Sequence, residues 1–117
     1  MEYSKPFLGK IVTVVIDRPF GTKHPKHNYI YPVNYGYVLD TVAPDGAELD
    51  AYVLGEEKPL KDYTGRCIAI IHRTDDDDDK LIICKDGKNF SDDAIRQITH
   101  FQEQWFKSVI VRPNQAE

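Results

Sequence analysis

Short apolar segments separated by polar loops predict a domain built mainly of β-strands. Residues 9–17 are rich in β-branched side chains and end close to a proline, which predicts a strand apolar enough to be buried on both faces. Residues 66–72 and 81–85 predict two buried strands that pair as a hairpin, and residues 51–54 predict a shorter strand. Two polar segments between these strands predict loops: residues 20–28 and 55–64.

One segment has the periodicity of an amphipathic helix. Residues 91–107 place apolar side chains at steps of three and four, and Ser91 is positioned to cap the first turn. The apolar positions are Ile95, Ile98, Phe101 and Trp105. Residues 109–111 are expected to form either a closing strand or a tail packed on the sheet. Several short strands followed by one helix predict an α+β fold, a small β-barrel with a C-terminal amphipathic helix, in a single domain over residues 1–117.

The charge balance narrows the class of partner. The formal net charge is −4, and because a protein that follows a phosphate backbone needs a basic surface, nucleic acid is not expected as the main partner. No apolar run reaches the roughly 18 to 20 residues of a membrane span. The N-terminal residues lack a signal sequence, so we expect a cytoplasmic protein without a membrane partner. Cys67 and Cys84 lie in apolar segments and are expected to be buried, reduced thiols.

Tyrosines gather in the segment 28–42, which Pro32 and Gly36 interrupt. Tyr29, Tyr31, Tyr35 and Tyr37 occupy odd positions and would share one face of an unbroken strand. Pro32 and Gly36 favour a bulge or bend that re-aims some of them. These side chains form either an aromatic core or, at Tyr35 above all, a phenol that donates to a phosphate oxygen.

Two acidic segments are candidates for a cation site. The turn at residues 45–50 carries Asp45, Glu48 and Asp50 around a glycine, and residues 75–79 are five consecutive aspartates. Two carboxylates about 4 Å apart repel by roughly 4 kcal/mol at an effective dielectric near 20, so such a run needs either open water or a cation. The run is therefore a solvated loop tip or part of a cation site. Neither segment has the glycine and glutamate spacing of an EF-hand.

The loop at residues 20–28 concentrates basic groups in a chain of negative net charge. It contains Lys23, His24, Lys26 and His27. Lysine supplies a point charge for phosphate, and histidine titrates near neutral pH. The loop is therefore either a solvated connection or a clamp for an anion.

Two motifs follow each other in the chain: Tyr31-Pro32-Val33-Asn34-Tyr35-Gly36-Tyr37 and then the acidic turn at 45–50. In their type and order they resemble the motifs of the family I inorganic pyrophosphatases. The resemblance extends over residues 9–107 and marks the chain as a short, divergent member. It implies an OB-like β-barrel and a carboxylate cluster that binds Mg²⁺, with Mn²⁺ as an alternative. The implied substrate is a small phosphorylated anion, and bacterial relatives assemble as homo-oligomers.

The same resemblance assigns site residues. The metal ligands it implies are Asp45, Asp50, Asp75 and Asp78, with Asp79 as an alternative to Asp78. The substrate contacts are Tyr35 and Lys80, joined by Lys23 and Lys26 because the family's hairpin with a phosphate-binding arginine is missing here. Asp17 corresponds to an acidic residue near the metals. These roles require the two acidic segments to converge at the mouth of the barrel.

The chain departs from the family where the chemistry is performed. Ala47 replaces the aspartate that activates water, which leaves Glu48 as a substitute base beside Asp50. Trp105 and Phe106 replace a tyrosine and a lysine. The first hypothesis is therefore a magnesium-dependent hydrolase of inorganic diphosphate or a related phosphoanhydride. The alternative is a weakened module that binds a phosphorylated ligand or a protein partner, and a third is single-stranded nucleic acid on exposed tyrosines.

Overall fold

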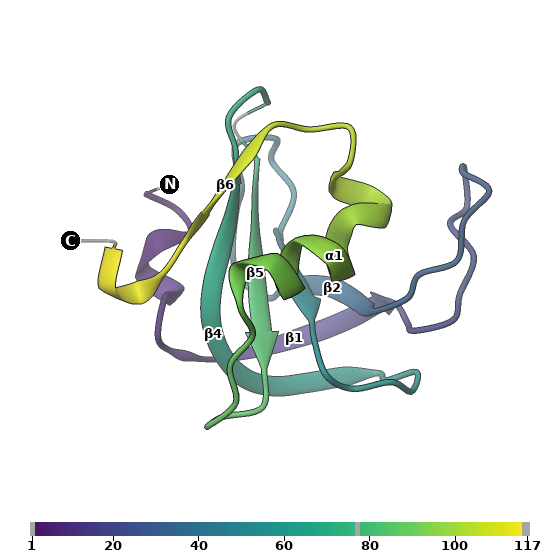
Figure 1. Ribbon diagram of the computed structural model, residues 1–117, viewed down its shortest axis with the longest axis horizontal. Helices are drawn as coiled ribbons and strands as arrows, with labels where there is room; N and C mark the ends of the chain where they lie inside the picture. Colours follow the sequence, from purple (N-terminus) through teal and green to yellow (C-terminus); the bar gives the residue numbers. More distant parts are fainter. Residues whose placement is uncertain (1, 77, 116–117) are drawn as a thin grey trace.

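A computed structural model of the chain describes residues 2–76 and 78–115. Asp77 of the acidic run and the ends of the predicted domain lie outside these residues. Within them the chain forms six strands and one α-helix, flanked by two short 3-10 helices (Figure 1). The elements are η1 (Lys5–Phe7), β1 (Ile11–Arg18), β2 (Asn34–Val38), β3 (Leu49–Val53), β4 (Asp62–Arg73), β5 (Asp79–Cys84), α1 (Asp92–Glu103), β6 (Ser108–Val111) and η2 (Pro113–Gln115).

The strands close into a small mixed barrel. Their order is β1-β2-β3-β5-β4, and pairing of β4 with β1 closes the ring, while β6 pairs with the far end of β4. All neighbours are antiparallel except β3 and β5, which run parallel. The predicted hairpin of β4 and β5 and the closing strand β6 are confirmed. The predicted α+β fold, an OB-like barrel with a C-terminal helix, is confirmed as well.

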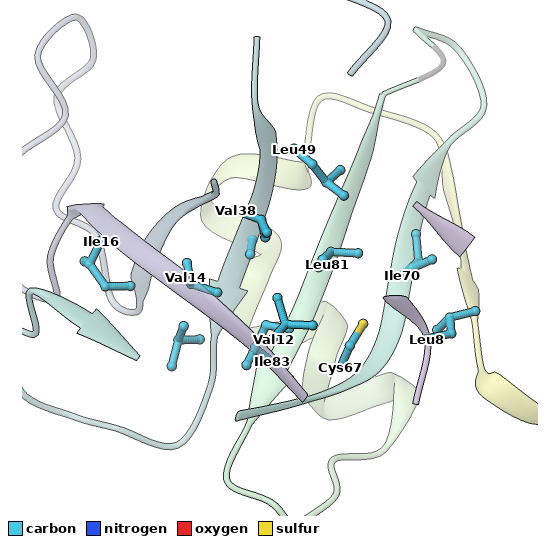
Figure 2. Packing of buried hydrophobic residues seen from close by; sticks show 12 residues of the cluster. Leu8, Val12, Val14, Ile16, Val38, Leu49, Cys67, Ile70, Leu81 and Ile83 are labelled. Carbon is cyan, nitrogen blue, oxygen red and sulfur yellow. The ribbon is translucent and has the colours of Figure 1, made fainter. Parts of the chain in front are cut away.

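Two apolar clusters lie on the two faces of the barrel wall. Figure 2 shows the first, in which Val12, Val14 and Leu81 pack together inside the barrel. The second lies between the wall and α1, where Ile95 packs with Tyr52. All six residues of β5 are buried, and its apolar side chains from Leu81 to Cys84 alternate between the two clusters. Burying an aliphatic side chain stabilises the fold by about 1.5 to 3 kcal/mol, so these clusters provide the main stabilisation.

The first strand is buried on one face only, so the prediction of burial on both faces was wrong. Burial alternates along β1, and Ile11 keeps 50% of its surface exposed. The reason is the position of α1: its Ile95 packs with Tyr52 of β3 and Ile82 of β5, whereas no helix lies along β1 in Figure 1. High apolar density in this strand therefore did not mean two covered faces.

The boundaries of two elements differ from those predicted. β4 begins at Asp62, inside the predicted loop 55–64, because its polar first residues pair with β1 while their side chains reach solvent. α1 is capped by Ser91, whose Oγ accepts a hydrogen bond from Ala94 N at 3.1 Å. The helix ends at Glu103, so Trp105 and Phe106 lie in the turn beyond it.

The irregularity predicted around Gly36 lies in the opposite strand. The register of β1 with β2 shifts between Ile16 and Arg18, which leaves Asp17 at a bulge. Gly36 faces Ile16 there, and a Cβ at this position would lie 1.8 Å from the carbonyl oxygen of Val15. Glycine at position 36 thus allows β1 and β2 to approach closely at the bulge that contains Asp17.

Two smaller predictions concern the cysteines and the membrane. Cys67 and Cys84 are free and buried, as expected. In the part of the chain that the structure describes, no helix has the length and apolar character needed to cross a membrane.

Candidate active site

The parallel pairing of β3 with β5 brings the two acidic segments together. Asp50 lies opposite Lys80 in the register of these strands. The Lys80 ammonium donates to Asp50 Oδ2 at 2.6 Å and to Asp78 Oδ2 at 2.9 Å. Asp50 comes from the predicted acidic turn and Asp78 from the aspartate run, so these two carboxylates share one cation.

Lys80 is buried, with 5% of its side chain exposed. Desolvation lowers its pKa, but the carboxylates of Asp50 and Asp78 outweigh this effect and raise the pKa above its ordinary value. The side chain therefore remains an ammonium ion at neutral pH. The nearby positive charge of Arg73 lowers the pKa of Lys80.

Strand alternation distinguishes Asp78 from Asp79. Successive side chains point to opposite faces, so Asp78 and Lys80 share one face and Asp79 occupies the other. Asp79 is fully buried, accepts a hydrogen bond from Ser4 Oγ, and its Oδ1 lies 2.6 Å from His72 Nδ1. The interpretation of the whole run as a solvated tip was therefore wrong for Asp79, whose carboxylate has two partners inside the protein.

Tyr35 supplies a neutral hydroxyl next to this cluster. Its ring centroid lies 5.8 Å from Lys80 Nζ. Desolvation raises the pKa of Tyr35 well above its ordinary value, and the Asp50 carboxylate raises it further. The phenol stays protonated and can donate a hydrogen bond to an anionic oxygen.

Arg73, which the sequence reasoning missed, is the second buried cation. Its guanidinium forms two hydrogen bonds with Glu103, at 2.9 and 2.8 Å, and contacts Asp76 and Asp78 at 3.3 and 3.5 Å. Its Cζ lies 3.7 Å from the Phe106 ring centroid. The signal that could have found it is an arginine that ends an apolar strand and is separated from the aspartate run by one residue.

A chain of hydrogen bonds continues from Arg73 under the helix. Tyr52 OH donates to Glu103 Oε2 at 2.6 Å and accepts from Gln102 Nε2 at 2.8 Å. Gln102 Oε1 accepts from Tyr31 OH at 3.1 Å. The last turn of α1 thus links the loop after β1 with the acidic loop before β5.

A pocket of about 530 Å³ opens beside these residues. Tyr35, Arg73 and Lys80 reach it from strands β2, β4 and β5. The other lining residues are His24, His27 and Tyr29 from the loop after β1, and Gln102, Trp105 and Phe106 from the end of α1 and the turn beyond it. In Figure 1 this loop projects past β1 on the side toward which α1 ends.

The basic loop turns its histidines, rather than its lysines, toward the pocket. Lys23 pairs with Ile30 in an isolated antiparallel bridge, and both Lys23 and Lys26 are exposed. Neither lysine lines the pocket beside Lys80, whereas His24 and His27 do. The substrate contacts predicted for Lys23 and Lys26 remain a prediction.

His24 organises the tip of this loop as a neutral imidazole. Its Nδ1 accepts backbone hydrogen bonds from Lys26 at 2.9 Å and from His27 at 3.1 Å. Desolvation lowers the pKa of His24, and the charges of His27, Arg18 and Lys26 lower it further. A proton on Nδ1 would displace both N–H donors.

We therefore expect His24 to titrate below the ordinary histidine value of about 6.5. Because its folded-state pKa is depressed, its contribution to the loop is complete above the unfolded-state pKa and is lost as pH falls through the folded-state pKa. Nitrogen NMR of the imidazole should find the Nε2–H tautomer, and the Lys26 and His27 amide signals should move in the same step. A midpoint above about 6.5 would contradict this assignment.

The remaining predicted residues occupy the surrounding loops. Asp45 is exposed and its Oδ1 accepts from Ala47 N at 3.0 Å within the acidic turn. Asp75 is exposed and its Oδ2 accepts from Lys107 N at 3.0 Å. Glu48 is exposed, on the approach to β3.

The bulged Asp17 lies within electrostatic reach of the acidic turn. Desolvation raises its pKa above the ordinary value, and the Asp50 and Glu48 carboxylates contribute in the same direction, while Arg18 opposes them. Across residues 2–76 and 78–115, no three side chains of His, Cys, Asp or Glu form a preassembled metal-binding group. The described cluster instead holds its carboxylates around Lys80 and Arg73.

Comparison with solved structures identifies the fold. The inorganic pyrophosphatase from Ehrlichia chaffeensis matches with a TM-score of 0.71 and 19% identity, covering 94% of this chain and 90% of that one. The enzyme from Neisseria gonorrhoeae matches with a TM-score of 0.68 and 22% identity over 92% and 86% of the two chains. The enzyme from Thermus thermophilus matches with a TM-score of 0.66 and 22% identity, covering 91% of this chain and 84% of that one. These matches define the class as the pyrophosphatase-type α+β barrel.

The sequence itself gives the family. The family model for inorganic pyrophosphatase matches residues 10–111, and the chain belongs to this family. The resemblance in the tyrosine segment and the acidic turn is thereby confirmed, and the protein is an enzyme of the inorganic diphosphatase class. A search of curated proteins finds no match.

Proposed function

We propose that this chain is a magnesium-dependent hydrolase of inorganic diphosphate or a related phosphoanhydride. The observation that carries the proposal is the meeting of Asp50, Asp78 and Lys80 beside the pocket that Tyr35 lines. Carboxylates for a divalent cation and donors for a phosphate stand next to each other there. Phosphoryl transfer depends mainly on positioning and charge neutralisation, which such an arrangement supplies.

The donor set fits a magnesium ion. Asp50 and Asp78 already share one cation, the Lys80 ammonium, and Mg²⁺ is commonly held by one or two carboxylates together with water and substrate phosphate. Asp45 and Asp75 are the weaker members of the proposed ligand set, because each already accepts a backbone N–H in its own loop. When bound, Mg²⁺ or Mn²⁺ would neutralise phosphate charge and lower the pKa of water.

The residues around the cluster have separate roles in this proposal. Lys80 and the Tyr35 hydroxyl donate hydrogen bonds to phosphate oxygens. Arg73, which lies beside the end of α1, stabilises the negative charge of the phosphate. Glu48, with Asp17 as the alternative acceptor, takes the proton that the attacking water loses, since Ala47 has no carboxylate. The raised pKa of Asp17 suits proton transfer near neutral pH better than an unperturbed carboxylate would. A less well positioned base costs about 10²- to 10⁴-fold in rate, so slow turnover is expected.

Purified protein is expected to release phosphate from diphosphate in the presence of Mg²⁺, over many turnovers. Release should stop when the divalent ion is chelated and return when Mg²⁺ or Mn²⁺ is added. The measurement is a phosphate assay on enzyme whose mass and folded state have been checked. Release no faster than that of an Asp50→Asn variant would remove the proposal.

A binding module without turnover is the second candidate, and Ala47 favours it. The acidic turn has an exposed alanine at the position of the family's base. Lys80, in addition, is already satisfied by two carboxylates. Thermal stabilisation by Mg²⁺ and diphosphate without phosphate release would support this function, whereas multiple turnovers would exclude it.

A further inference from the structure

The pocket beside Lys80 is larger and more aromatic than phosphate binding alone requires. Its volume of about 530 Å³ lies within the range of sites for organic ligands, roughly 300 to 1,000 Å³. Phosphate oxygens need cations and N–H or O–H donors, which Lys80, Arg73 and Tyr35 supply at one part of the lining. The aromatic rings that make up most of the rest have no role in holding a bare diphosphate.

Three of these rings lie roughly parallel. The ring centroids of His27 and Tyr29 are 5.8 Å apart with an interplanar angle of 9°. Trp105 lies 6.3 Å from His27 and 6.4 Å from Tyr29, with an angle of 28° to each. Trp105 nevertheless keeps 61% of its surface exposed, so one large π-surface remains available to a ligand.

His24 extends the aromatic surface rather than the cationic one. Its Nδ1 accepts the backbone N–H groups of Lys26 and His27, which requires the neutral imidazole. Its ring lies 5.9 Å from that of Tyr31 at an angle of 13°. This side of the pocket therefore presents stacked aromatic rings, with His24 as a neutral member.

The charges at the phosphate side are already compensated. Lys80 and Arg73 contact four carboxylates, from Asp50, Asp76, Asp78 and Glu103. A small, highly charged anion consequently gains little from these two cations alone. A ligand that adds a planar base gains stacking as well, worth about 5- to 150-fold in affinity, the equivalent of roughly 1 to 3 kcal/mol.

We propose that the pocket takes an organic phosphoanhydride with a planar base, a nucleoside 5′-diphosphate or triphosphate. The base stacks on Trp105 beside His27 and Tyr29, and the phosphates extend toward Lys80 and Tyr35. This inference rests on the proposed hydrolytic function and names its substrate class. Hydrolysis adds one water: its oxygen bonds to phosphorus, the bridging P–O bond breaks with its electrons on the leaving phosphate, and a proton is released to solvent.

The test uses Trp105, the single tryptophan of the chain, as a reporter. Adenosine 5′-(α,β-methylene)diphosphate, added with Mg²⁺ to the full chain, should change the tryptophan emission saturably, and inorganic diphosphate should change it less. Calorimetry then compares Trp105→Ala with Trp105→Phe. The alanine variant should bind the analogue about 10-fold more weakly, and the phenylalanine variant should retain most of the affinity.

The control variant is Ile11→Ala, which removes an exposed apolar side chain of β1 outside the pocket lining. It should bind the analogue as the unchanged chain does, and all three variants should keep the circular dichroism spectrum of the parent. Equal affinity of the alanine and phenylalanine variants for the analogue would overturn the inference.

Phosphate release measured on the same protein separates this inference from the proposed function. Hydrolysis of diphosphate by a chain that neither binds the analogue nor cleaves adenosine 5′-diphosphate would overturn the inference and leave the proposed function standing. Suppose instead that the analogue binds in a way that depends on Trp105, but phosphate is released from neither diphosphate nor adenosine 5′-diphosphate. This result would support the proposed ligand class and overturn the proposed hydrolytic function.

Discussion

Replacing Asp50 by asparagine is expected to reduce diphosphate hydrolysis by about 10²- to 10³-fold, a loss comparable to that from removing one hydrogen-bond donor of a preorganised oxyanion hole. Asparagine keeps the size of the side chain but removes the carboxylate that binds Lys80 at 2.6 Å and that we propose as a metal ligand. The measurement is the initial rate of phosphate release at saturating Mg²⁺.

The matched control is Asp62→Asn, an exposed aspartate at the start of β4. It removes the same charge from the same barrel and should leave the rate unchanged. Asp50→Asn should also lower the pKa of Lys80, because Asp50 makes the largest contribution among the charges that raise it. If the Asp50→Asn variant kept more than about a tenth of the parent rate, the carboxylate would not belong to the reacting site.

Replacing Glu103 by glutamine is expected to lower the free energy of unfolding by about 3 kcal/mol. Glu103 is 8% exposed and is the main partner of the Arg73 guanidinium, through both carboxylate oxygens. Glutamine keeps one acceptor oxygen but no charge, so the buried Arg73 is left with the more distant Asp76 and Asp78 as its carboxylate partners. Urea unfolding followed by circular dichroism measures the change.

Asp92→Asn is the control for this stability prediction. It breaks the ion pair of Arg112 with Asp92, whose side chain is 55% exposed, and should cost less than about 1 kcal/mol. The double variant Arg73→Met with Glu103→Leu replaces both charges by apolar groups and should recover most of the loss. A cost for Glu103→Gln no larger than that of Asp92→Asn would refute the argument.

The local elements could be predicted from the sequence because each has a local cause. The β-branched runs formed strands, and Ser91 capped the helix where expected. The extent of burial could not be predicted in the same way. The outer face of β1 is exposed because α1 covers another part of the barrel, which only the tertiary arrangement decides.

The geometry of the candidate site could be predicted in part, and the roles of its residues stay predictions. Convergence of the turn at Asp50 with the aspartate run followed from the family resemblance, and the structure brings Asp50 and Asp78 to Lys80. The choice between Asp78 and Asp79 depends on which face of β5 each occupies, and this requires the first residue of the strand to be known. The partnership of Arg73 with Glu103 joins positions 30 residues apart and has no local signal.

The parallel contact of β3 with β5 has a consequence for how the molecule folds. The long β4 separates these two strands in the chain, so their pairing is a non-local contact. The chain loses the conformational entropy of closing this loop before the contacts between the strands stabilise it. The Lys80 ammonium can contact both Asp50 and Asp78 only in a chain whose β3 and β5 are aligned. We therefore expect a chain in which β3 and β5 are not yet paired to lack the assembled cluster.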